Sequence, residues 1–278
     1  MNVAVAQFPI SSDISQNRDR YLQQIAEAKG QGADLVVFSE ASLSGYGGDE
    51  WHDWRAIDMM ALAAAEKAVR QCLADHEIWG TIGTAEFADG DKRRKPLNAT
   101  LTVDPRGRVR ALYGKVFCTP GDLDHYTAGS TFPAVTIDGV RTGSLICFDF
   151  RFPELYRTYL RKNVRLMIHP FYQVGAPPYK TGLSHIGPIH IKSRAAENCM
   201  YVIAPNCGNK NSAWGSMIVN PDGEVILQLP RARAGVRTVS IDITPFTRGW
   251  TEVRRKNARR AMLGRQPLTS REAQRVHQ

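Results

Sequence analysis

The chain has 278 residues, of which 43% are hydrophobic and 23% are charged, an ordinary composition for a globular protein that can bury its own core. It contains no run of about 18 apolar residues, which excludes a membrane-spanning helix, and its five scattered cysteines form no CxxC pair, which argues against a disulfide framework or a zinc site. The net charge of +9 comes mostly from residues 248–278, which contain nine arginines and lysines but only two glutamates.

In the first part of the chain, apolar runs alternate with helical stretches. Strands are predicted at residues 2–7, 34–38, 78–87, 97–103 and 109–113, and helices at 17–30 and 59–76. The run DLVVF at 34–38 is almost continuously apolar, which is typical of a sheet that is buried on both faces. The segment DPRG at 104–107 predicts a hairpin turn between two of these strands.

The second part continues the alternation and ends in a meander. Strands are predicted at 140–147, 164–169, 200–205, 213–219, 225–229 and 236–241, and helices at 153–162 and 187–198. Residues 171–188 are rich in Pro, Gly and Tyr and read as a long loop that could line a site. Strand–helix alternation with several hairpins predicts one domain, residues 1–246, with a mixed sheet covered by helices.

Residues 247–278 are predicted to be a basic C-terminal extension, either a solvated tail or a subunit contact. Its charge could attract nucleic acid, but no aromatic-interleaved basic face accompanies it, so nucleic acid is not favoured as a partner. The start of the chain lacks the basic and apolar regions of a signal peptide. Together with the cysteine pattern, this favours a protein of the reducing cytoplasm without a membrane partner.

Three predicted strands each lead into a chemically capable side chain. DLVVFSE ends at Glu40, ALYGK ends at Lys115, and TGSLICFDF delivers Cys147. Active sites in α/β sheets gather at the carboxyl ends of strands, so these three residues are candidates for one site. Spacing alone is weak evidence, because many strands end in a polar residue.

The segments FSEASLSGY, YGKVF and ICFDFRFPELYR resemble, in the same order, the three signature blocks of the nitrilase-type carbon–nitrogen hydrolases. The resemblance continues in RAAEN and in WGSMIVNPDGEV and covers about 240 residues. It implies a four-layer αββα sandwich, with two mixed β-sheets flanked by helices. It also implies a homodimer or a higher homo-oligomer.

The resemblance assigns Glu40 as general base, Lys115 as catalytic lysine and Cys147 as nucleophile. These roles fit the chemistry, because a thiol needs a base or a nearby positive charge to attack a carbonyl carbon. The Lys115 ammonium and the backbone N–H of Phe148 would then stabilise the oxyanion. No metal and no organic cofactor is required.

Many members of the family have a second glutamate shortly after the lysine, but the corresponding stretch here, KVFCTPGDLDHYTAG, has none. Asp122 or Asp124 could take its place, and both could also be turn residues. We expect Asp124 rather than Asp122 to do so.

Five further residues are candidates for the wall of the substrate pocket by the same resemblance: Tyr46, His169, Phe171, Tyr172 and Trp214. Tyr46 could equally be a packed residue of its turn. The sequence Cys147-Phe148-Asp149 differs from the Cys-Trp-Glu that is usual in nitrile-cleaving branches and is closer to amidases and carbamoylases. The sequence therefore predicts hydrolysis of a small non-peptide amide, less readily of an N-carbamoyl group. The alternatives are a nitrile hydrolase or an inactive scaffold member of the family.

Overall fold

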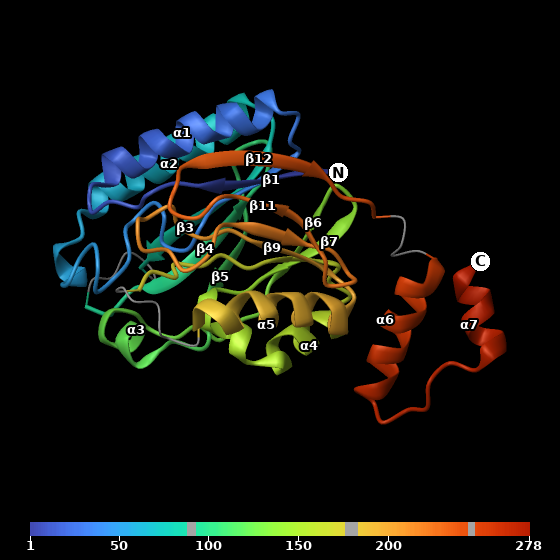
Figure 1. The fold of residues 1–278 in the computed structure, drawn as a ribbon. Helices are drawn as coiled ribbons and strands as arrows, with labels where there is room; N and C mark the ends of the chain where they lie inside the picture. Colours follow the sequence, from blue (N-terminus) through green and yellow to red (C-terminus); the bar gives the residue numbers. More distant parts are fainter. Residues whose placement is uncertain (88–92, 176–182, 244–247) are drawn as a thin grey trace.

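The structure is a computed structural model, which describes residues 1–87, 93–175, 183–243 and 248–278. In these residues two six-stranded sheets lie face to face, and helices cover their outer faces (Figure 1).

The first sheet has the strand order β12-β1-β2-β3-β4-β5. Its strands are β1 (Asn2–Gln7), β2 (Leu35–Val37), β3 (Trp79–Glu86), β4 (Leu97–Val103), β5 (Val109–Gly114) and β12 (Gly235–Ser240). The strands β1, β2 and β3 are parallel, whereas β12, β4 and β5 join as antiparallel strands at the two sides.

The second sheet repeats this plan in the order β11-β10-β9-β8-β7-β6. Its strands are β6 (Ala134–Ile137), β7 (Val140–Ser144), β8 (Leu166–Ile168), β9 (Tyr201–Ala204), β10 (Met217–Val219) and β11 (Val225–Gln228). Strands β7, β8 and β9 are parallel, and β6, β10 and β11 are antiparallel to their neighbours. Both sheets are therefore mixed.

The helices of the described residues are α1 (Ile14–Gly30), α2 (Met59–Asp75), α3 (Pro120–His125), α4 (Pro153–Arg161), α5 (Leu183–Asn198), α6 (Gly249–Ala261) and α7 (Ser270–His277), with short 3₁₀ turns η1 (Trp54–Ala56) and η3 (Cys147–Arg151). Helices α1 and α2 cover the first sheet, and α4 and α5 cover the second (Figure 1). The N-termini of α1 and α2 are capped by Asp13 and Asp58, whose carboxylates accept backbone N–H groups of the first turn.

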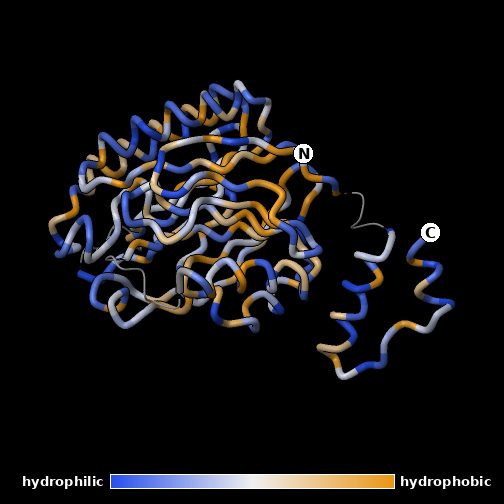
Figure 2. The backbone as a smooth tube through the Cα atoms, in the orientation of Figure 1, coloured by the Kyte–Doolittle hydropathy of each residue, from blue (hydrophilic) through white to orange (hydrophobic). Residues whose placement is uncertain are grey.

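Alternation along the strands builds three separate hydrophobic layers. In β1, Val3 and Val5 point between the two sheets, whereas Ala4 and Ala6 point toward α1 and α2. A third cluster, which includes Met167 and Val202, fills the space between the second sheet and its helices. Figure 2 shows hydrophobic stretches along the central strands and mixed hydropathy along the outer helices. Three apolar layers between four layers of elements are the four-layer αββα sandwich that the family resemblance implied.

Element boundaries differ from the prediction mainly near the site. The strand predicted at 140–147 ends at Ser144, and Cys147 begins the 3₁₀ turn η3 instead. The helix α3 and the strand β6 were not predicted. Helix α5 begins at Leu183, inside the predicted loop 171–188, and residues 176–182 of that loop lie outside the described residues.

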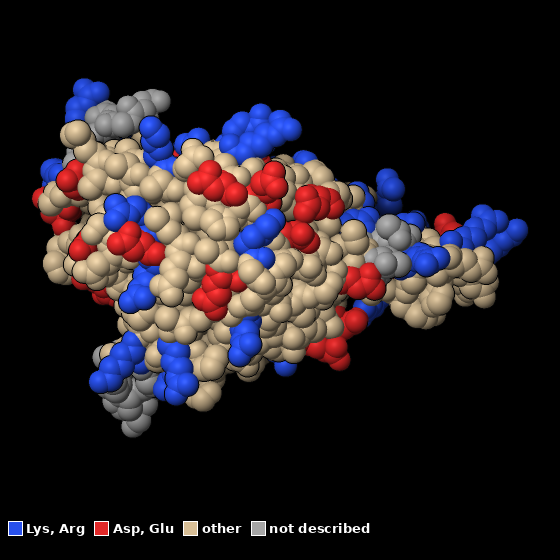
Figure 3. Space-filling model, turned by 90° about the horizontal axis from the view of Figure 1, so that it is seen from above, with Lys and Arg blue, Asp and Glu red and all other residues tan. Residues whose placement is uncertain are grey.

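The predicted C-terminal extension contains two helices, α6 and α7, that pack on each other. Arg255 anchors α6: its buried guanidinium donates hydrogen bonds to the backbone carbonyls of Asn198, Cys199 and Val164. On the face shown in Figure 3, Lys and Arg are interspersed with Asp and Glu. Within the part of the chain that the structure describes, no helix is long and apolar enough to cross a membrane.

Candidate active site

The structure brings the three predicted site residues together from both sheets. Glu40 follows β2 and Lys115 follows β5 in the first sheet, whereas Cys147 lies after β7 in the second. All three are buried. Lys115 Nζ lies 2.9 Å from Glu40 Oε1, and the Cys147 thiol lies close enough to both groups for Glu40 to raise its pKa and for Lys115 to oppose this.

The carboxylate of Glu40 is held by donors on both oxygens. Oε1 accepts from Asn98 Nδ2 at 2.7 Å and from Lys115 Nζ, and Oε2 accepts from the backbone N–H of Tyr172 at 2.7 Å. The backbone turns sharply just after it, where Ala41 has a φ of 52°. Gly83 on β3 permits this turn, since a Cβ there would lie 2.3 Å from the carbonyl oxygen of Ser39.

Lys115 is completely buried but has two carboxylate partners, Glu40 and Asp122, the latter at 2.8 Å. Burial alone would lower the pKa of Lys115, but the negative charges around it, Glu40 first, raise that pKa well above its usual value. The side chain is therefore a fixed ammonium.

Asp122, rather than the Asp124 we expected, contacts the lysine. Its carboxylate accepts hydrogen bonds from Lys115 Nζ, from the backbone N–H of Thr119 at 2.8 Å and from the Tyr46 hydroxyl. Burial opposes ionisation of Asp122, but Lys115 and these hydrogen bonds hold its pKa below the usual range. Asp124 is exposed on the same short helix α3. The physical reason is the capping box at Thr119, which turns the third residue of α3 inward and leaves the fifth on the solvent side.

Cys147 occupies a strained backbone position with a φ of 43°, which a non-glycine residue rarely adopts. Its backbone N–H donates to the Pro170 carbonyl at 2.8 Å, and its carbonyl accepts from His169 Nε2 at 3.1 Å. Burial, and then the nearby Glu40 carboxylate, raise the pKa of the Cys147 thiol well above its usual value, although Lys115 opposes them. The resting site therefore holds a neutral thiol.

His169 supports this turn from behind instead of lining the pocket as expected. Because the carbonyl of Cys147 can only accept, the proton of the imidazole lies on Nε2, and Nδ1 accepts from the Tyr156 hydroxyl at 2.5 Å. Burial lowers the pKa of His169 to about 3, so it is neutral at any ordinary pH.

Asp149 is a site residue that the sequence did not assign a role. Its Oδ2 accepts from the backbone N–H of Ile146 at 2.9 Å and from the Tyr113 hydroxyl at 2.7 Å, and its Oδ1 accepts from the backbone N–H of Phe117 at 2.8 Å. Burial raises the pKa of Asp149 to about 6, against the effect of these donors. Its place two residues after the predicted nucleophile is the sequence signal that could have identified it, whereas Asn98, a second buried polar residue of the site, has no such signal.

A cavity of about 210 Å³ opens onto the sulfur and is lined by residues that include Tyr46, Lys115, Cys147, Phe148 and Tyr172. The rings of Tyr46 and Tyr172 stack with centroids 4.4 Å apart. Tyr46 and Tyr172, which the sequence predicted for the pocket wall, thus lie in the lining, and so does Phe148, whose backbone N–H was predicted to bind the oxyanion.

Phe171 and Trp214 lie deeper than predicted. Phe171 is fully buried, stacks on His169 with centroids 4.7 Å apart and meets Trp214 edge-on at 5.4 Å. Neither residue lines the described part of the cavity. Both side chains pack away from the cavity. Phe171 is directed inward because the backbone of the segment after β8 pairs with the residues at the end of β9 and just after it.

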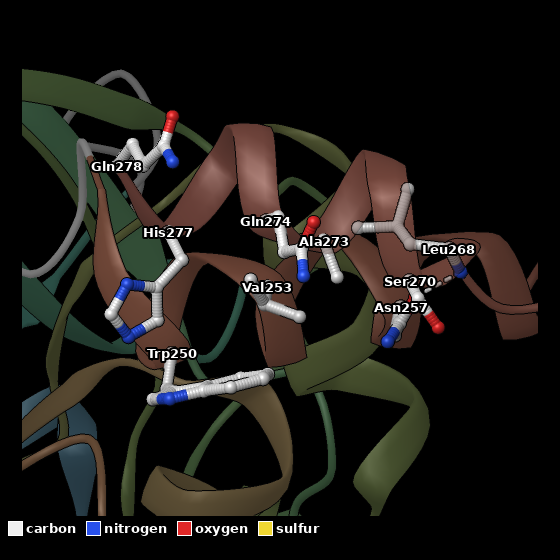
Figure 4. A pocket seen from close by; sticks show the side chains of 9 residues that line it. All are labelled: Trp250, Val253, Asn257, Leu268, Ser270, Ala273, Gln274, His277 and Gln278. Atoms are coloured by element: carbon white, nitrogen blue, oxygen red, sulfur yellow. Dashed lines mark hydrogen bonds between the residues drawn. The ribbon is translucent and has the colours of Figure 1, made fainter.

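A second cavity, of about 520 Å³, lies between α6 and α7, and Figure 4 shows the side chains that line it. Trp250, Val253 and Leu268 provide its apolar wall, and His277 meets Trp250 edge-on at 5.0 Å. Its described lining contains no cysteine, carboxylate or lysine, so it lacks the groups that the chemistry of Cys147 needs. Within the described ranges, no group of three or more His, Cys, Asp or Glu side chains could hold a metal ion.

The chain is similar to known proteins over most of its length. The family model Carbon-nitrogen hydrolase matches residues 2–247. The chain is 32% identical over 234 residues to "Hydrolase in pqqF 5'region" of Pseudomonas protegens. The aligned region covers 81% of this chain and 78% of that protein. It is 30% identical to an (R)-stereoselective amidase of a Pseudomonas species, over 79% of this chain and 77% of the relative.

Among solved structures, the NitN amidase from Nesterenkonia sp. AN1 has the same fold, with a TM-score of 0.78, 22% identity and coverage of 95% of this chain and 98% of that chain. With a family model matched along most of its length and relatives at this level of identity, the chain belongs to the carbon-nitrogen hydrolase family.

Proposed function

We propose that this protein is a cysteine-dependent amidase that hydrolyses the amide of a small molecule through a thioester on Cys147. The observation that carries the proposal is the arrangement of Cys147, Glu40 and Lys115 in one buried cluster at the end of a small cavity. Two of the similar proteins are named as amidases, which supports an amide as the substrate.

In the acylation half-reaction, Glu40 takes the thiol proton as the sulfur of Cys147 attacks the amide carbon. A base is needed because the raised pKa of Cys147 keeps it protonated at rest. The tetrahedral oxyanion is stabilised by the Lys115 ammonium and by the backbone N–H of Phe148. When the carbon–nitrogen bond breaks, Glu40 returns the proton to the leaving nitrogen, so that ammonia or an amine departs and a thioester remains.

In the second half-reaction, water attacks the thioester and Glu40 takes its proton. The carbon–sulfur bond breaks, and the proton passes to the departing thiolate. The products are a carboxylic acid and the free enzyme. Lys115 and Asp122 keep their charges throughout, and Asp122 acts by holding Lys115 in place.

The test is release of ammonia from a panel of small aliphatic amides by the purified chain and by Cys147→Ala. We expect release by the chain, loss of release in Cys147→Ala, and retention in the matched control Cys72→Ala, a partly exposed thiol on α2. Ammonia release that survives Cys147→Ala would exclude the thioester mechanism. A thiol at Cys147 that reacts with iodoacetamide no faster than the other cysteines would favour an inactive scaffold.

We also propose that the active form is a homodimer of the cytoplasm, with residues 247–278 as an extension that contributes to subunit contact. The exposed Ile189 on α5 and the exposed Trp250 and Leu263 near α6 support an interface on that side. The five free cysteines support a reducing compartment. Light scattering of the full chain should give twice the mass of one chain, and a monomer at micromolar concentration would contradict the proposal.

A further inference from the structure

We propose that the pocket selects amides whose acyl chain ends in a positively charged amine, and that Asp49 is the residue that recognises this charge. The inference rests on the proposed amidase function and names the substrate class of that site. It goes beyond the three-residue chemistry, which any small amide could use.

The first step concerns the cation already in the pocket. Lys115 is a described lining residue with a positive charge, but its ammonium is held by Glu40 at 2.9 Å and by Asp122 at 2.8 Å. An ammonium has three N–H donors, of which two serve these carboxylates and the third serves the oxyanion, so Lys115 has no donor left for an anionic group at the far end of the acyl chain. No other lysine or arginine is among the described residues that line the cavity.

The second step concerns the carboxylate in the wall. Asp49 lines the cavity and is exposed at its mouth. The negative charge of Asp49 acts on the neighbouring wall. It is one of the causes that raise the pKa of Tyr172, after burial and the charge of Glu50. The Glu50 carboxylate lies behind Tyr172 and accepts a hydrogen bond from its hydroxyl, with an O–O distance of 2.7 Å. The mouth of the pocket thus carries negative potential.

The third step concerns the aromatic wall between the mouth and the sulfur. The hydroxyl of Tyr46 donates to Asp122 and that of Tyr172 to Glu50, so both polar ends are already used. Between the mouth and the sulfur the substrate meets mainly aromatic rings, those of Tyr46, Tyr172, Phe148 and Phe150, and the neutral side chains of Thr119, Gln173 and Val174. Aromatic faces attract cations and offer nothing to a carboxylate, which would lose its hydration there.

These steps combine into a direction of selectivity. A chain that carries an ammonium group gains from Asp49 and from the rings, whereas a chain that carries a carboxylate meets like charge and no free cation in the described lining. The cavity of about 210 Å³ is below the usual range for drug-sized ligands, which fits a short acyl chain.

The experiment compares three amides of similar length: γ-aminobutyramide, which is cationic, pentanamide, which is its neutral isostere, and succinamate, which is anionic. We expect kcat/KM to be about threefold to tenfold higher for γ-aminobutyramide than for pentanamide, since Asp49 is exposed, solvent weakens its field, and the rings add a modest attraction. Succinamate should be the poorest substrate. A pentanamide or succinamate rate that equals or exceeds that of γ-aminobutyramide would overturn the proposal.

Variants then test Asp49 itself. Asp49→Asn should lower the ratio of kcat/KM for the cationic and neutral amides by about twofold to fivefold, and Asp49→Glu should restore most of it. The matched control Asp19→Asn removes the same charge from the exposed face of α1 and should leave the ratio unchanged. The wild-type ratio should fall as salt concentration rises. An unchanged ratio in Asp49→Asn would overturn the role of Asp49.

The outcomes separate this proposal from the proposed function. If no amide is hydrolysed in a Cys147-dependent way, the proposed function is wrong and the selectivity proposal, which rests on it, falls with it. If amides are hydrolysed by Cys147 but without preference for the cation, the function stands and the selectivity proposal is wrong.

Discussion

Replacing Asp122 with Asn should damage both activity and stability, although Asp122 does not touch the sulfur. The carboxylate accepts three hydrogen bonds, from Lys115, Thr119 and Tyr46. An amide of the same shape has one acceptor oxygen and an NH₂ group, so at least one of these donors must lose its partner. A hydrogen bond to a charged group contributes about 1.5–3 kcal/mol, and an unpaired buried donor adds its own cost.

The expected loss is therefore about 3 kcal/mol of unfolding free energy, at the lower end of the range for breaking a buried ion pair, because Glu40 remains as a partner of Lys115. For a chain of this size that corresponds to a fall of about 6–12 °C in Tm. Turnover should fall by about tenfold to a hundredfold, less than for complete removal of an oxyanion donor.

The variant should also change the thiol. The negative charge of Asp122 is one of the influences that raise the pKa of Cys147, after burial and Glu40. Without it, the pKa of Cys147 should fall, and the pH at which iodoacetamide alkylates the thiol at half its maximal rate should move to a lower value. Faster alkylation at neutral pH together with slower turnover would separate thiol activation from positioning of the lysine.

The matched control is Asp124→Asn, two residues further along α3 and exposed. It should leave turnover, Tm and the alkylation profile close to those of the unmodified chain. Calorimetry, steady-state kinetics and alkylation of both variants decide the matter. Near wild-type turnover and Tm in Asp122→Asn would refute the reasoning, and the same losses in Asp124→Asn would show that the comparison of the two aspartates is mistaken.

Three further predictions follow from the same site. Glu40→Gln should lower turnover by at least about a hundredfold in steady-state assays, since the base is lost; near wild-type turnover would require another base. Because the pKa of Asp149 is about 6 and its protonated form cannot accept all three hydrogen bonds, kcat should fall as pH decreases through about 6; a pH–rate profile that is flat there would contradict this. An amide should have a higher kcat/KM than the corresponding nitrile, and the reverse order would reassign the chain to the nitrile-cleaving branch.

Most of the strands and helices and the three central residues could be predicted from the sequence because their signals are local and ordered. Apolar runs marked the strands, and Glu40, Lys115 and Cys147 each lie within a short recognisable block. The pairing of twelve strands into two sheets could not be derived from periodicity alone, because the apolar runs of β2 and β8 look alike although they lie in different sheets. That step depended on resemblance to a family.

The errors arose where burial depends on long-range packing. Asp122 and Asp124 are alike as residues, and only the capping of α3 by Thr119 decides which one faces Lys115. His169 and Phe171 follow a strand that leads to the site, yet the backbone pairing of this segment directs them behind Cys147. Asn98 lies in β4, 58 residues from Glu40 in the sequence, and nothing near it indicates that it binds that carboxylate.

Asp149 explains how two separate sheets can hold one reactive geometry. Lys115 belongs to the first sheet and Cys147 to the second, so ordinary variation in the packing between sheets would change the distance between ammonium and sulfur. The Asp149 carboxylate accepts from Phe117, two residues after the lysine, and from Ile146, directly before the cysteine. A single buried side chain therefore ties the two segments together and leaves few ways for either to move alone. Asp149, two positions after the nucleophile, is therefore required mainly to assemble the site. Its identity says less about which substrate the enzyme cleaves.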